Sequence, residues 1–329
     1  MSVLTRSHVP TILLLSVFFG SNLVVSRFAL GQFHPVTFVA TRMPIAALLA
    51  VLWARLQYGS FPSGRRLWLH GSVVGIFATA APMIFFVSAL QYQSSGVTAL
   101  FISLTPISAM VYAHFRMPDE PMTTRKALGA LLSFAGVALL LVTGETGLGE
   151  TNWEGFVLVL IGVASNGFGT SHVRKYLSGQ RSLDIAAVRL TAAATATVPF
   201  AAVADGFDYS SVAWSGVLAL VYGVLPGTLL AFSLYSFVVA RFGATKGTQV
   251  EYLVPVVAAL TGWVFLDERI TIVMVVGMAV VFAGIAVATV RRRPGGVMNA
   301  GSDRAAAGPG SSGRCRRAGS VRHGRYDSS

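Results

Sequence analysis

Long apolar runs dominate this chain and limit what it can fold into. A helix needs about 20 apolar residues to cross the ~30 Å of hydrocarbon in a bilayer, and the runs here reach that length. Charged residues make up only 12% of the 329-residue chain, whereas a soluble domain carries about 25%. We therefore expect an all-α polytopic membrane protein with ten transmembrane helices. The expected spans are 9–30, 35–56, 69–91, 94–115, 125–143, 153–173, 183–203, 212–238, 244–265 and 270–290.

The basic residues lie almost entirely on one side of these spans. Of the 25 lysines and arginines, 21 fall before the first span, after the last one, or in alternate connections. Arg27 and Arg269 fall on the other side, and Arg42 and Arg189 lie within spans. Cytoplasmic loops are enriched in Lys and Arg, so we expect both termini to be cytoplasmic. The net charge of +12 is then an orientation signal together with a basic tail, and we expect no nucleic-acid partner.

Several catalytic classes lack their residues in this sequence. The one cysteine, Cys315, allows neither an internal disulfide nor a cysteine-rich metal site. No phosphate-binding G-x-x-x-x-G-K-[ST] motif is present, and neither H-E-x-x-H nor G-x-S-x-G occurs. We therefore expect no ATP hydrolysis, no other enzyme activity, no metal and no cofactor.

The sequence contains an internal repeat. The segment "GALLSFAGVALLL" begins at Gly129 and "GMAVVFAGIAVAT" begins at Gly277, with a Phe-Ala-Gly triplet at the same place in both. Four further pairs keep the same order at offsets of 144 to 149: Ser21-Asn22 with Ser165-Asn166, Arg42 with Arg189, Pro106 with Pro255, and Asp119-Glu120 with Asp267-Glu268. This shared order indicates a duplication of five spans.

Because five is an odd number, the second copy must enter the membrane from the opposite side. The expected domains are a first five-helix repeat at 9–143, an inverted second repeat at 153–290 and a disordered basic cytoplasmic tail at 291–329. Inverted repeats give secondary transporters two conformations around a site near the bilayer midplane. The alternative is a duplicated helical bundle without transport activity, acting as a receptor or scaffold.

These segments resemble those of the EamA-type transporters of the drug/metabolite transporter superfamily. In the first half the resemblance is carried by "FGSN" in the first span, "HPVTFVATR" ending at Arg42, and "GVTALFISLTP" ending at Pro106. In the second half it is carried by "GATKGTQVEYLVP" and "LDERITIVMVVGMAVVFAGIAV". It covers residues 9 to 290 and implies an exporter or permease of small metabolites or amphipathic compounds in the bacterial cytoplasmic membrane. It also implies that a gradient, and not ATP, drives the transport.

Glu251 is the carboxylate that lies well inside a span. Glutamate is too short to reach a headgroup from there, and an ionised carboxylate in hydrocarbon is costly. Its cost falls if it faces the interior of the bundle or takes up a proton, because burial disfavours the charged form. Pro255, four residues later, has no N–H, so the carbonyl of Glu251 loses its helical partner. We expect Glu251 to bind a proton or a substrate cation; the alternative is pairing with Lys246 or a neighbouring arginine.

Two arginines occupy equivalent places in the second and seventh spans. Arg42 and Arg189 each lie about seven residues into their spans, roughly 10 Å at about 1.5 Å per residue. From that depth an arginine can extend to a lipid headgroup or brace a loop. The alternative is that it binds an anionic group of the substrate, and the sequence leaves both interpretations open.

The other candidates for substrate binding or coupling are Asn22, Asn166, Gln249 and Tyr222. The two asparagines have mirrored places in the first and sixth spans, where each could line a cavity or join two helices. Pro106 and Pro255 are expected to kink their helices. The expected partners are the lipid bilayer, a small-molecule substrate and protons as the coupling ion, and a homodimer is left open.

Overall fold

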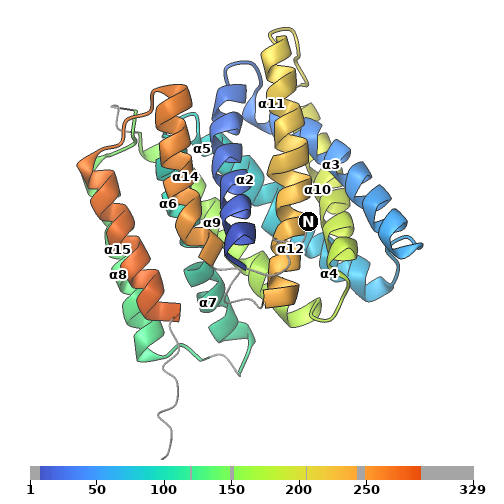
Figure 1. The fold of residues 1–329 in the computed structure, drawn as a ribbon, viewed down its shortest axis with the longest axis horizontal. Helices are drawn as coiled ribbons and strands as arrows, with labels where there is room; N and C mark the ends of the chain where they lie inside the picture. The colour runs from blue at the N-terminus through green and yellow to red at the C-terminus, as the bar shows by residue number, and fades with distance from the viewer. Residues whose placement is uncertain (1–7, 119–120, 149–151, 205, 243–248, 290–329) are drawn as a thin grey trace, which may run out of the picture. The chain divides into compact units, whose positions relative to one another are not determined.

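The computed structural model describes residues 8–118, 121–148, 152–204, 206–242 and 249–289, and the regular elements in them are helices (Figure 1). The first half contains α2 (His8–Ala29), α3 (Pro35–Tyr58), α4 (Arg65–Gly75), η1 (Ile76–Ala80), α5 (Ala81–Ala89), α6 (Ser95–Ile102), α7 (Thr105–Arg116) and α8 (Thr124–Thr143). The second half contains α9 (Trp153–Tyr176), α10 (Ser182–Ala204), α11 (Trp214–Val224), η2 (Leu225–Leu230), α12 (Ala231–Phe242), α14 (Gln249–Leu266) and α15 (Ile272–Thr289). The tail expected at 291–329 lies outside the described residues.

Nine helical segments in the described part of the chain are long and apolar enough to cross a membrane. The third span consists of α4, η1 and α5, the fourth of α6 and α7, and the eighth of α11, η2 and α12. The ninth expected span corresponds to α14, in which Tyr252–Leu266 is a shorter apolar helix. The predicted all-helical membrane protein is confirmed, with nine spanning segments and one shorter apolar helix among the described residues.

The third span begins earlier than expected, and the expected start of the ninth lies outside the described residues. The third span was expected to begin at residue 69, but α4 already begins at Arg65, so Arg65 and Arg66 belong to its first turn and not to the preceding loop. Long arginine side chains tolerate this position because they reach the interface from a helix end. The ninth span was expected from residue 244, and residues 243–248 lie outside the described part of the chain.

The fifth helices of the two repeats, α8 and α15, pack side by side (Figure 1). The glycines of the repeated motif form this contact. A Cβ atom on Gly129 would lie 2.5 Å from the carbonyl oxygen of Gly284, and one on Gly136 would lie 2.8 Å from that of Gly277. Residue numbers rise along α8 as they fall along α15, so the two helices are antiparallel. Equivalent helices that run in opposite directions are what an inverted duplication requires.

The third span of each repeat contains a π-helix, and the two π-helices occupy equivalent places. η1 occupies Ile76–Ala80 and η2 occupies Leu225–Leu230, and their starting positions differ by 149 residues. Pro82 follows η1 closely, and Pro226 is the second residue of η2. Because proline has no backbone N–H, carbonyl groups one turn earlier lose their helical partner. π-Helices inside α-helices are frequently found at functional sites.

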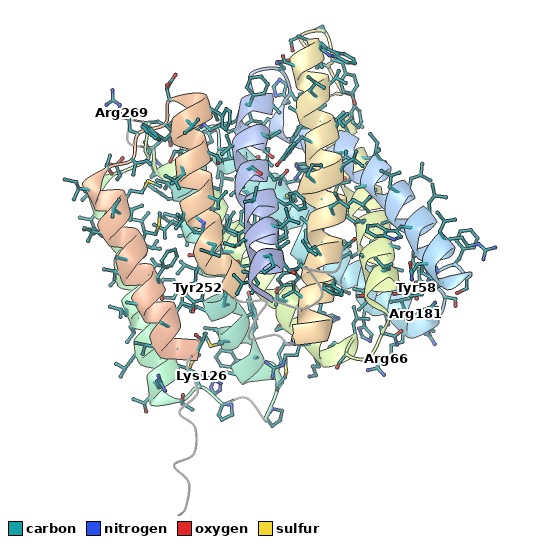
Figure 2. All side chains as sticks on the ribbon, in the orientation of Figure 1. Tyr58, Arg66, Lys126, Arg181, Tyr252 and Arg269 are labelled. Atoms are coloured by element: carbon teal, nitrogen blue, oxygen red, sulfur yellow. The ribbon has the colours of Figure 1, made fainter. Side chains whose placement is uncertain are left out.

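Basic side chains labelled in Figure 2 lie at opposite ends of the helices. In Figure 2, Lys126, Arg66 and Arg181 lie at one end, and Arg269 lies at the opposite end. This separation matches the asymmetry in the sequence, from which Lys126, Arg66 and Arg181 are predicted to be cytoplasmic. We refer to these ends as the predicted cytoplasmic end and the predicted outer end, because the orientation stays a prediction.

Candidate functional site

Two polar clusters lie where the first two helices of one repeat meet the third span of the other. The Arg42 cluster consists of Ser21, Asn22, Ser26, Arg42 and Tyr222. The Arg189 cluster consists of Ser165, Arg189, Phe77, Ala78 and Thr79. The repeat relates the helices that carry them, so each cluster is the structural counterpart of the other.

Arg42 is a completely buried arginine in α3, with 0% of its surface exposed. Full burial excludes the interpretation that its side chain reaches a lipid headgroup. Its Nη1 atom lies 3.5 Å from Asn22 Oδ1 and 3.5 Å from Ser26 Oγ, at the outer limit of a hydrogen bond. Asn22 and Ser26 are four residues apart in α2, so both lie on the helix face that meets α3.

The remaining contacts of the Arg42 guanidinium are also weak. Nη2 donates to the sulfur of Met83 at 2.7 Å, and a thioether is a poor acceptor. The guanidinium carbon lies 5.2 Å from the centre of the Phe38 ring, within the range of a cation–π contact. The Nε atom is buried and has no hydrogen-bond partner. The ion pairs between described residues do not include Arg42.

Glycines in the eighth span bring it close to this cluster. A Cβ atom on Gly223 would lie 3.3 Å from Arg42 Nη1, and one on Gly227 would overlap the side chain of Asn22. Next to them, the hydroxyl of Tyr222 lies 2.7 Å from Ser21 Oγ. Polar groups from the first two helices of the chain therefore lie directly against the third span of the second repeat.

Arg189 in α10 has stronger partners than Arg42. Its Nε donates to Thr79 Oγ1 and its Nη2 donates to the carbonyl oxygen of Ala78, both at 2.9 Å. Pro82 explains why this carbonyl is free, because a residue with an N–H at that position would have bonded it within the helix. The guanidinium also lies over the Phe232 ring, 4.5 Å from its centre. Arg189 therefore satisfies a backbone group of η1 that a proline has released.

Ser165 completes the Arg189 cluster in the same way. Its hydroxyl donates to the carbonyl oxygen of Phe77 at 2.8 Å, one residue before the carbonyl that Arg189 binds. The neighbouring Asn166 donates from Nδ2 to Thr105 Oγ1 at 3.4 Å. Thr105 precedes Pro106, which is the second residue of α7, directly after the break between α6 and α7. Asn166 thus contacts the first repeat at its broken fourth span.

The candidates in the ninth span are placed only by their backbone. Gln249 and Glu251 belong to the first turn of α14, and their side chains fall outside the described set. Pro255 lies inside α14, which is helical from Gln249 to Leu266. The roles of Gln249 and Glu251 therefore stay predictions.

Sequence reasoning missed several contact residues of the two clusters. Ser26, Thr79 and Met83 are single polar or soft side chains in apolar helices, and nothing in the local sequence distinguishes them. The repeat offset contains one usable signal, because Thr79 and Thr228 are equivalent and both are buried. Among the described residues, no group of three or more histidine, cysteine or acidic side chains is arranged to hold a metal ion.

Comparison with known proteins identifies related chains. The sequence profile of the EamA-like transporter family matches this chain at residues 7–142 and again at 153–290. The chain is 26% identical over 276 residues to a WAT1-related chloroplastic protein of Arabidopsis thaliana, covering 82% of this chain and 66% of that protein. It is 24% identical over 251 residues to the uncharacterized inner membrane transporter YedA of Escherichia coli (strain K12), covering 75% of this chain and 79% of that protein. A protein crystal structure with 20% sequence identity has the same fold, with a TM-score of 0.61 over 87% of this chain and 96% of that one.

Proposed function

The chain belongs to the EamA-like transporter family, and on that premise we propose that it is a secondary transporter that works by alternating access. Its cargo is a small metabolite or an amphipathic compound, and its direction is export across the bacterial cytoplasmic membrane. The family consists of transporters and not enzymes, in keeping with the absence of catalytic motifs from the sequence.

One observation carries this proposal: in each polar cluster, side chains of one repeat contact the other repeat. Ser165 and Arg189 of the second repeat contact η1 of the first, while Asn22 and Arg42 of the first repeat lie against Gly223 and Gly227 of the second. A scaffold needs apolar packing at such an interface, and buried polar groups in a membrane protein are costly enough to indicate function. A rocking motion of one repeat against the other would open and close these contacts from opposite sides.

We place both termini in the cytoplasm and the 5–6 connection outside the cell. The supports are the distribution of basic residues and the name of the E. coli relative, which is an inner membrane transporter. Export then means that solute enters from the predicted cytoplasmic end and leaves at the predicted outer end.

Glu251 is the coupling residue in this proposal. Its support is its position in an apolar span, where an ionised carboxylate is costly and a protonated one is not. Binding a proton in one conformation and releasing it in the other would couple solute movement to the proton gradient.

Flux through the purified protein tests the proposal against the receptor or scaffold alternative. The full chain is reconstituted in proteoliposomes and screened with amino acids, nucleosides and cationic drugs. We expect saturable flux of at least one class that protein-free liposomes do not show. Binding of solutes without flux of any of them would leave the receptor alternative in place.

Glu251→Gln tests the coupling residue, because it keeps the size of the side chain and removes its titratable group. We expect the variant to lose gradient-driven accumulation while it still exchanges solute across the membrane. The matched control is Glu154→Gln, an exposed carboxylate at the start of α9. Wild-type dependence of flux on pH in Glu251→Gln would show that Glu251 does not couple protons.

A further inference from the structure

Arg42 and Arg189 are equivalent in the repeat, yet they have very different surroundings. Arg189 donates to the η1 acceptors Thr79 and Ala78 at 2.9 Å. The equivalent acceptors for Arg42 would be Thr228 and the carbonyl of Gly227 in η2. Arg42 donates to neither of them, and the Thr228 hydroxyl donates to the carbonyl oxygen of Gly223 at 2.7 Å. Arg42 therefore does not hold the opposite π-helix as Arg189 does.

The two π-helices also differ in a residue that closely follows them. Ala231 stands at the position equivalent to Pro82, 149 residues later. Unlike a proline, Ala231 has a backbone N–H, and it donates that hydrogen to the carbonyl oxygen of Pro226. Pro226 is the counterpart of Phe77, whose carbonyl is free to accept from Ser165. Because η2 satisfies this carbonyl itself, the bond that Ser165 makes to η1 is not needed in η2.

The guanidinium of Arg42 is thus a buried charge with little compensation. It has five N–H donors, of which Nε has no partner, and its other contacts are two oxygen atoms at 3.5 Å and one sulfur. Burying a cation without a counter-ion costs several kcal/mol, and membrane proteins retain such groups where they bind a substrate or ion. Among the described residues, the ion pairs supply no negative charge to this guanidinium.

The geometry around Arg42 defines which anion would fit. A guanidinium presents parallel N–H donors that match the two oxygens of a carboxylate or phosphate. The Asn22 amide and the Ser26 hydroxyl lie beside Nη1 and can supply further donors. Phe38 and Met83 form apolar surface next to the guanidinium, which suits a solute with a nonpolar body.

We propose that Arg42 binds the anionic oxygens of the transported solute, so that the cargo is an organic anion carrying a carboxylate or a phosphate group. This inference rests on the proposed function. Access to Arg42 requires the contacts of α2 with the eighth span to open, in particular Ser21 with Tyr222 and Asn22 with Gly227. Alternating access supplies that opening from one side at a time.

Ligand-dependent thermal stability of the purified full chain tests the proposal. The probes are matched pairs: phenylacetate with phenylacetamide, succinate with succinamide, and glycerol 3-phosphate with glycerol. We expect at least one anion to raise the melting temperature while its neutral analogue does not. Comparison of the two carboxylate pairs with the phosphate pair shows which of the two anionic groups the site binds.

Two variants locate the effect at Arg42. In Arg42→Gln the affinity for the protecting anion should fall at least about 30-fold, because truncating one partner of a buried charge pair costs at least that much. Arg42→Lys keeps the charge but loses the parallel N–H donors of the guanidinium, and should bind with intermediate affinity. The control, Arg55→Gln, changes an exposed arginine of the same helix and should bind as the wild type does.

Three results would overturn the proposal: equal protection by a neutral analogue, unchanged anion affinity in Arg42→Gln, or protection by cationic or neutral solutes with none by any anion. Flux measured on the same preparation separates this failure from failure of the proposed function. Transport of a cationic solute would reject the anion site and leave the transporter proposal standing. Anion binding through Arg42 without flux of any solute would do the reverse.

Discussion

The Nε atom of Arg27 lies 3.0 Å from a carboxylate oxygen of Glu268, at the predicted outer end of the helices. Both carboxylate oxygens of Glu268 also accept from the backbone N–H of Ser95 at 3.0 Å, and one accepts from the Ser95 hydroxyl at 2.6 Å. Ser95 is the first residue of α6, where the helix dipole favours an anion. Glu268 therefore joins α2, α6 and the α14–α15 connection, which come from both repeats.

Glu268→Gln should destabilise the protein. Glu268 is 3% exposed and Arg27 is 22% exposed, and removing the charge of one partner of a buried ion pair costs roughly 3 kcal/mol. Thermal unfolding in detergent measures the loss. The control is Asp267→Asn, since Asp267 is exposed and Asn tolerates its positive φ of 54°. Equal melting temperatures for Glu268→Gln and the wild type would show that the pair does not stabilise this end.

The contact between α8 and α15 gives a second prediction. A Cβ atom on Gly284 would lie 2.5 Å from the backbone nitrogen of Ser133 and 2.6 Å from the carbonyl oxygen of Gly129. Gly284→Leu should therefore separate the helices and strongly reduce the yield of folded protein, because overpacking alone costs about 1–3 kcal/mol. Size-exclusion profiles of the purified protein report the outcome. Ala279→Leu, at an exposed position of the same helix, should behave as the wild type, and similar losses in both variants would contradict the contact.

Arg189 and Arg42 should differ in their effects on stability. Arg189→Gln loses two bonds to η1, and bonds from a charged donor are worth about 1.5–3 kcal/mol each. Arg42→Gln removes a buried charge without a described acidic partner, so it should leave the stability unchanged or raise it. Melting temperatures without added solute compare the two. A decrease in Arg42→Gln as large as that in Arg189→Gln would mean that Arg42 also joins the repeats.

The same comparison shows how far sequence reasoning reaches. The spans and the repeat could be predicted because hydrophobic length and repeated glycines are local features of the chain. The equivalence of Arg42 and Arg189 could be predicted too, but their different roles could not. That difference depends on which carbonyl Pro82 releases and on contacts such as Met83 with Arg42, which join helices far apart in the chain.

The orientation can be tested by labelling single cysteines in a Cys315→Ser background. Gly147, in the 5–6 connection, is a poor site for this purpose, because its φ is +74° and a side chain there would overlap Ser94. Gln91 in the α5–α6 turn and Ser63 before α4 are exposed and lie on opposite sides in the predicted topology. An impermeant thiol reagent should label Gln91→Cys in intact cells and Ser63→Cys only after permeabilisation. The opposite pattern would reverse the orientation.

Transport by alternation of the two repeats is the central claim, and trans-stimulation tests it most directly. Proteoliposomes containing the full chain are loaded with an unlabelled solute that raises the melting temperature, and uptake of the labelled solute is then followed. A carrier that alternates between two conformations returns faster with cargo than without it, so loading should accelerate uptake several-fold and the rate should saturate. Uptake that does not exceed that of protein-free liposomes, or that rises linearly and ignores the internal solute, would contradict the account.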